Sequence, residues 1–155
     1  AGGVMAAAFV TRLGFGKTDV IQMLNGCIGG LVAITAEPLM PSPIAAILIG
    51  AVGGVIVVFG TKLLFSLKID DVVGAVPAHL FAGIWGTLAV PITNPDTNFG
   101  AQLLGVVSIN AFVFIVSLIV WAIMKNTIGI RLSKEGELKG TDVTETGVIA
   151  YAIRD

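Results

Sequence analysis

The sequence is poor in the residues from which soluble catalytic and metal sites are built. It contains one cysteine, Cys27, and one histidine, His79, and only 12% of its residues are charged. A lone cysteine excludes a disulfide within the chain, and no cysteine or histidine cluster has metal-ligand spacing. A catalytic triad and a glycine-rich phosphate loop followed by lysine also lack their parts. We therefore predict a protein that is not an enzyme, with no catalytic residues, no bound metal and no cofactor.

Apolar residues, by contrast, are abundant. They make up 55% of the chain, and the mean hydropathy is +0.97. Soluble domains carry a charged share of about 25%, roughly twice that of this chain. The composition therefore predicts a polytopic membrane protein whose surroundings are the lipid bilayer. The net charge of -1 comes without any basic patch that could neutralise phosphates, so we predict no nucleic-acid partner.

The apolar stretches predict an all-α bundle with four full transmembrane helices and one partial helix. Residues 1–10 are interpreted as the end of a truncated helix, because they lack the basic start and cleavage site of a signal peptide. A short loop around Arg12 and Lys17 follows. The full helices are expected at about 20–36, 43–65, 72–92 and 99–124, separated by proline-containing connectors. Residues 1–125 then form a transmembrane domain, and residues 126–155 form a polar tail.

The basic residues predict the orientation of this bundle. If the helices alternate in direction, Arg12, Lys17, Lys62 and Lys68 fall on the same side as the tail that starts at Lys125. Every lysine and arginine of the chain lies on this side. The positive-inside rule makes it cytoplasmic, which places a multi-pass protein in a cell (inner or cytoplasmic) membrane with its carboxyl terminus in the cytoplasm.

His79 is the main candidate for a functional side chain. It lies near the middle of a run without charged residues that is long enough to cross a bilayer. A polar ring at that depth needs a partner or a water-filled cavity, and desolvation favours its neutral form. Ala75, Val76 and Gly83 are close to it on a helix, and their small size leaves room either for a file of small molecules or for another helix. His79 therefore lines a substrate path or is a satisfied packing histidine.

The residues before His79 predict how its helix begins. Asp70 and Asp71 suit a structural role as helix caps, because carboxylates accept hydrogen bonds from the open amides of a first turn. Pro77 has no N–H and deprives the Val73 carbonyl of its usual helical partner. We expect a bend or a bound polar group at that carbonyl.

Three separated motifs carry a resemblance to a known family. They are NGCIGGLVAITAE from Asn25, IDDVVGAVPAHLFAGIWGTLAV from Ile69 and RLSKEGELKGTDVTETGVIAY from Arg131, the last ending in Ala150 and Tyr151. In this order they are similar to the carboxyl-terminal half of ammonium transporters of the Amt/Mep/Rh family. The resemblance covers essentially all of the chain, but well under half of a typical family member.

The resemblance implies an eleven-helix fold, a homotrimer with one pore per subunit, and ammonium or ammonia as substrate. In such transporters ammonium gives up a proton and passes between two hydrogen-bonded histidines in a hydrophobic conduit. His79 matches the second of these histidines, and the first belongs to the amino-terminal half. The family also implies that the tail packs under a neighbouring subunit and that a PII-type regulatory protein can block the cytoplasmic face.

Two further functions remain open beside ammonium transport and nitrogen uptake. The first is an ammonium sensor or membrane scaffold on the same fold, which signals through the cytoplasmic tail. The second is a small stand-alone membrane assembly factor. Flux of the substrate distinguishes transport from both, whereas binding without flux favours a sensor.

Overall fold

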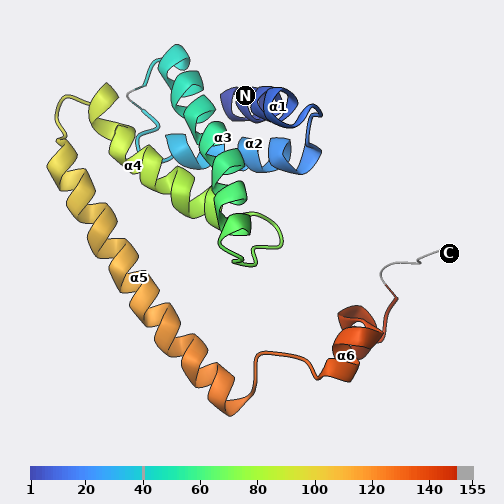
Figure 1. Ribbon diagram of the computed structural model, residues 1–155. Coiled ribbons are helices and arrows are strands. Elements are labelled where there is room, and N and C mark those ends of the chain that lie inside the picture. The colour runs from blue at the N-terminus through green and yellow to red at the C-terminus, as the bar shows by residue number, and fades with distance from the viewer. Residues whose placement is uncertain (40, 150–155) are drawn as a thin grey trace. The chain divides into compact units, whose positions relative to one another are not determined.

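The computed structural model describes residues 1–39 and 41–149, and within these residues it contains helices joined by loops and no strands. The elements in order are α1 (Gly2–Phe15), α2 (Val20–Ile34), α3 (Pro43–Ser66), the π-helix η1 (Val76–Phe81), α4 (Ala82–Thr93), α5 (Phe99–Thr127), α6 (Lys134–Lys139) and the π-helix η2 (Asp142–Thr146) (Figure 1). The prediction of an all-α membrane bundle is confirmed. The chain divides into two compact units, Ala1–Ile109 and Asn110–Asp155, and each is described by itself.

Three helical stretches are long and apolar enough to cross a membrane. They are α3 with 24 residues, η1 with α4 over 18 residues, and α5 with 29 residues. The fourth expected full span, α2, has 15 residues and ends at Ile34. At 1.5 Å per residue it extends about 22 Å, less than the roughly 30 Å of a hydrocarbon core. It is shorter than predicted because the chain leaves the helix before Pro38.

Other boundaries also differ from the sequence prediction. The histidine helix begins with η1 at Val76 and not near residue 72, because a turn separates it from Asp71, and α5 continues to Thr127. Helix α1 does not stop near residue 10 but continues to Phe15, because Gly16 takes a left-handed conformation with φ of 75° and the Arg12 guanidinium donates to its carbonyl at 2.9 Å. Basic side chains near a helix end bind its last carbonyls in this way. Helix α4 contains Pro91 in its last turn and ends at Thr93, close to the predicted end at about residue 92.

Side chains before the helices α2 and α3 determine where each begins. Asp19 accepts a hydrogen bond from the Gln22 amide at 3.0 Å, and Ser42 accepts one from the Ala45 amide at 3.3 Å. Pro43 occupies the first turn of α3, where its missing N–H costs nothing. Asp19 is thus the N-cap of α2, and Ser42 is the N-cap of α3.

Glycines bring α1, α2 and α3 together. A Cβ on Gly54 would lie 2.2 Å from the Gly3 carbonyl oxygen, and one on Gly26 would lie 2.8 Å from the same oxygen. Beside them, a Cβ on Gly50 would lie 3.4 Å from the Gly30 oxygen. Small residues allow helix backbones to approach closely in lipid. Gly3 of α1 is therefore the residue against which both α2 and α3 pack.

The polar tail contains its own small folded element. Ser133 caps α6 by accepting a hydrogen bond from the Gly136 amide at 3.1 Å, and the Thr144 hydroxyl of η2 donates to the Gly136 carbonyl at 3.2 Å. Arg131 Nε lies 2.6 Å from Glu137 Oε1, and this hydrogen bond lowers the pKa of the Glu137 carboxyl. Ala150 and Tyr151, which end the third sequence motif, lie outside the described residues.

Candidate functional site: the histidine segment

The histidine segment, defined as residues 71–81, begins with a carboxylate cap. Asp71 Oδ1 accepts a hydrogen bond from the Ala75 amide at 2.9 Å, and Asp71 Oδ2 accepts one from the Val76 amide at 2.9 Å. Both acceptors therefore satisfy amides that have no intrahelical partner. Asp70, the other candidate cap, is exposed and makes no such bond within the described part of the chain. The carboxylate of Asp71 thus fixes the entry of the backbone toward His79.

A carboxamide from α2 satisfies the backbone where Pro77 cannot. Asn25 Nδ2 donates to the Val73 carbonyl oxygen at 2.8 Å. Pro77 would carry the partner N–H in a regular helix but has none. The polar group expected at this carbonyl is therefore the side chain of Asn25, which is buried between helices with 9% of its surface exposed.

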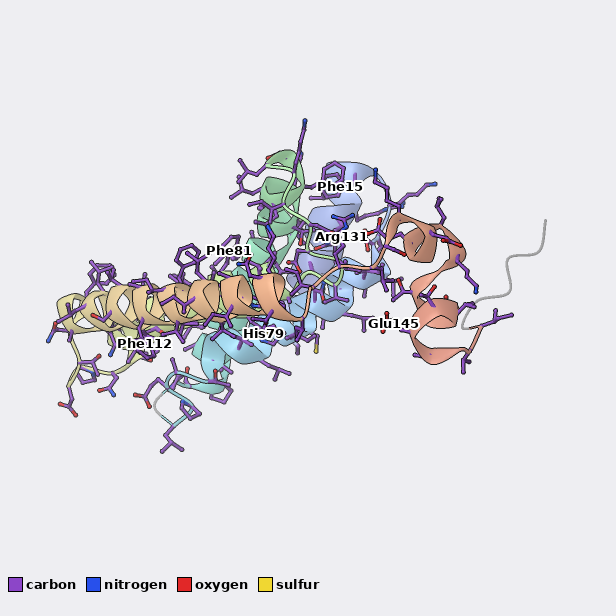
Figure 2. The ribbon with its side chains drawn as sticks, turned by 90° about the horizontal axis from the view of Figure 1, so that it is seen from below. Phe15, His79, Phe81, Phe112, Arg131 and Glu145 are labelled. Atoms are coloured by element: carbon purple, nitrogen blue, oxygen red, sulfur yellow. The ribbon has the colours of Figure 1, made fainter. Side chains whose placement is uncertain are left out.

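The segment then widens into the π-helical turn η1, which carries both His79 and Phe81 (Figure 2). Gly60 of α3 makes room for this turn, because a Cβ there would lie 2.7 Å from the Phe81 ring and 3.0 Å from Pro77 Cβ. The Ala82 amide closes the turn by donating to the Pro77 and His79 carbonyls. Single π-turns within helices are rare and are frequent at functional sites.

His79 itself is exposed on the surface of this chain. Its imidazole has no hydrogen-bond partner among the described residues, whereas Pro77 and Ala78 beside it are buried. Of the three predicted pore-lining residues, Ala75 is exposed, and Val76 and Gly83 are partly exposed. The ring is therefore not part of a packed core within the described chain.

Two hydrogen bonds hold the far end of this helix to the bundle. Trp85 Nε1 of α4 donates to the Ile49 carbonyl of α3 at 3.0 Å, and the ring packs against a buried cluster that includes Ile49. Asn94 Nδ2, which follows α4, donates to Glu37 Oε2 at 2.8 Å. With the cap at Asp71, these bonds fix both ends of the helix that carries His79.

A cavity of about 760 Å³ opens beside the start of the histidine segment, along the carboxyl end of α3. Its lining is mostly apolar and includes Thr61, Leu64 and Phe65 together with Asp70 and Asp71. Neither the cavity nor any other part of the described chain gathers three or more histidine, cysteine or acidic side chains that could hold a metal ion. The candidate site is thus a polar ring on a fixed apolar helix.

Sequence comparison places the chain beside proteins named as ammonium transporters. The family model "Ammonium Transporter Family" matches residues 1–151. Ammonium transporter Amt2 of Archaeoglobus fulgidus is 37% identical over 172 residues, which cover 97% of this chain and 36% of the relative. A putative ammonium transporter of Synechocystis sp., sll1017, is 41% identical over 151 residues, which cover 95% of this chain and 34% of the relative. The chain therefore spans about a third of the length of these curated relatives.

The fold also matches a solved structure. The structure titled "Sensor Amt Protein" has a TM-score of 0.86 and 26% sequence identity to this chain, over 94% of this chain and 39% of the other. This agreement extends the sequence relationship to the arrangement of the helices.

Proposed function

The chain belongs to the ammonium transporter family, and from this premise we propose that the full-length protein that carries it conducts ammonium or ammonia through a hydrophobic pore lined by His79. The observation that carries the proposal is the state of His79 within the chain. Its ring is exposed in an uncharged apolar helix, while the backbone around it is fixed by Asp71 and Asn25. A costly polar ring that the chain leaves outside its own core is best explained by a substrate path.

The chemistry of a neutral imidazole suits this task. It donates one hydrogen bond and accepts another, so it can replace part of the hydration shell that ammonia or ammonium loses on entering the pore. The small apolar residues Ala75, Val76 and Gly83 give a hydrated alkali ion no oxygen ligands in return for its water. Dehydration is costly without such replacement, so these ions are rejected.

The remaining features of the proposal follow from the family and from the charge distribution. The protein is a homotrimer in a cell membrane with its carboxyl-terminal tail in the cytoplasm, where a PII-type regulatory protein binds. The segregation of lysine and arginine to one side of the predicted bundle supports this orientation. The names of the relatives as transporters support a role other than catalysis.

Uptake of labelled methylammonium by cells that make the full-length protein tests the proposal. We expect His79→Ala to lower the uptake rate at least about tenfold or to admit potassium, because the ring no longer compensates for dehydration. Leu80→Ala, which truncates an exposed neighbour in the same turn, is the matched control and retains the rate. A His79→Ala protein with wild-type rate and selectivity contradicts the proposal.

A sensor is the second candidate, and the neighbour titled "Sensor Amt Protein" is the observation that favours it. In this case ligand occupancy is reported through residues 126–155. Binding of ammonium without flux supports the sensor. Flux that continues without any tail-dependent signal supports the transporter.

A further inference from the structure

The contact of Asn25 with the histidine segment has no role of its own in the function proposed above. Asn25 lies on α2, 48 residues before Val73, and it is one of two buried polar side chains in the described chain. We propose that Asn25 is a positioning residue for His79: its carboxamide donates to the Val73 carbonyl and thereby fixes the backbone from which the imidazole projects. The inference rests on the proposed transport function only for its effect on flux.

The position of the hydrogen bond makes it effective. Val73 lies three residues before η1, in the turn that joins Asp71 to the helix. An unpaired backbone carbonyl in an apolar interior is costly and favours local rearrangement. The Asn25 bond at 2.8 Å removes that cost and joins the start of the segment to α2. His79 follows Val73 by less than two turns, so a shift at Val73 moves the ring.

The surrounding backbone is shaped to admit the carboxamide. Gly74 has a φ of 74°, and a Cβ built on it would lie 2.5 Å from Asn25 Nδ2. The amide thus fills the space that a side chain at position 74 would occupy. Both the acceptor and the opening for the donor come from the histidine segment, which distinguishes this contact from ordinary helix packing.

Substitution of Asn25 in the full-length protein tests the inference. Asn25→Leu keeps the approximate shape of the side chain but removes the donor, and we expect the maximal methylammonium uptake per folded protein to fall about tenfold. Gln22→Leu is the matched control, because Gln22 lies one turn earlier on α2 and contacts Thr61 of α3 instead.

Hydrogen exchange gives a readout that is independent of flux. Asn25→Leu should raise exchange about tenfold at the amides of residues 76 and 78–82, while exchange in α3 stays as in the wild type. This readout tests the role of Asn25 even if the wild-type protein carries no flux. The absence of flux would contradict the proposed transport function but not the role of Asn25.

Uptake in Asn25→Leu equal to that in Gln22→Leu would overturn the proposal, as would unchanged exchange in the histidine segment. If Asn25→Leu does not accumulate in the membrane, the same two readouts are taken on Asn25→Ala, which also removes the donor but adds no bulk. Wild-type exchange in that variant would likewise overturn the proposal.

Discussion

The contact between α1 and α3 makes a sharp prediction about two glycines of one helix. Gly54 and Gly50 lie one turn apart on α3. A Cβ at position 54 would lie 2.2 Å from the Gly3 oxygen and 2.7 Å from Gly3 Cα, whereas a Cβ at position 50 meets its nearest atom at 3.4 Å. Ordinary van der Waals contact begins near this last distance, so the two sites differ sharply in the space they offer. Gly54→Ala should destabilise the protein, and Gly50→Ala should not.

The magnitudes follow from two opposing terms. Replacing a helical glycine by alanine stabilises a helix by about 1 kcal/mol, and both variants share this gain. Gly50→Ala should therefore be neutral or stabilise by up to about 1 kcal/mol. Gly54→Ala must move the backbone of α1 by about 1 Å, since the neighbours are main-chain atoms, and overpacking of this kind costs about 1–3 kcal/mol. The free energy of unfolding of Gly54→Ala should therefore be lower than that of the wild type by up to about 2 kcal/mol. It should be lower than that of Gly50→Ala by a larger amount.

Thermal unfolding of the full-length protein in detergent, followed by loss of the folded species, measures the difference. The matched pair removes the shared helix-propensity term, so the comparison isolates the contact with Gly3. A Gly54→Ala protein as stable as Gly50→Ala would refute the close approach of α1 and α3.

Three further predictions concern the histidine helix and the tail. Gly60→Ala should press on the ring of Phe81 and lower stability by about 1–3 kcal/mol, measured by the same unfolding assay. Trp85→Phe removes the hydrogen bond to the Ile49 carbonyl and should cost about 0.5–1.5 kcal/mol, and a variant of wild-type stability would contradict that bond. Arg131 lowers the pKa of Glu137, so the ion pair stabilises the tail fully at pH values above the ordinary carboxyl pKa of 4.5, and this stabilisation is lost as the pH falls through the lowered pKa. Glu137→Gln should abolish this pH dependence of the protection of amides near α6 from hydrogen exchange.

The sequence was sufficient to predict the elements whose signals are local. Long apolar runs located α3, the histidine helix and α5, and Pro43 marked the start of α3. The end of α1 was harder, because Arg12 bonds the Gly16 carbonyl one turn later, and a basic residue on its own does not indicate whether it lies in a helix or in a loop.

In the candidate site, too, the sequence predicted the local features but not the contacts between distant residues. His79 was evident as a polar residue in an apolar run, and the missing partner of the Val73 carbonyl was evident from Pro77. The identity of that partner was not, because Asn25 lies 48 residues away and only the packing of α2 brings it there. Gly60 and the π-turn likewise have no local signature. Sequence therefore indicated which groups needed partners, and the fold supplied the partners.

The most direct test of the central claim is ammonium flux into proteoliposomes that contain the full-length protein, measured with and without excess potassium. We expect that potassium does not inhibit the wild-type flux, and that His79→Ala lowers the flux at least about tenfold or makes it sensitive to potassium. The same flux and the same indifference to potassium in both proteins would contradict the assignment of His79 to the path.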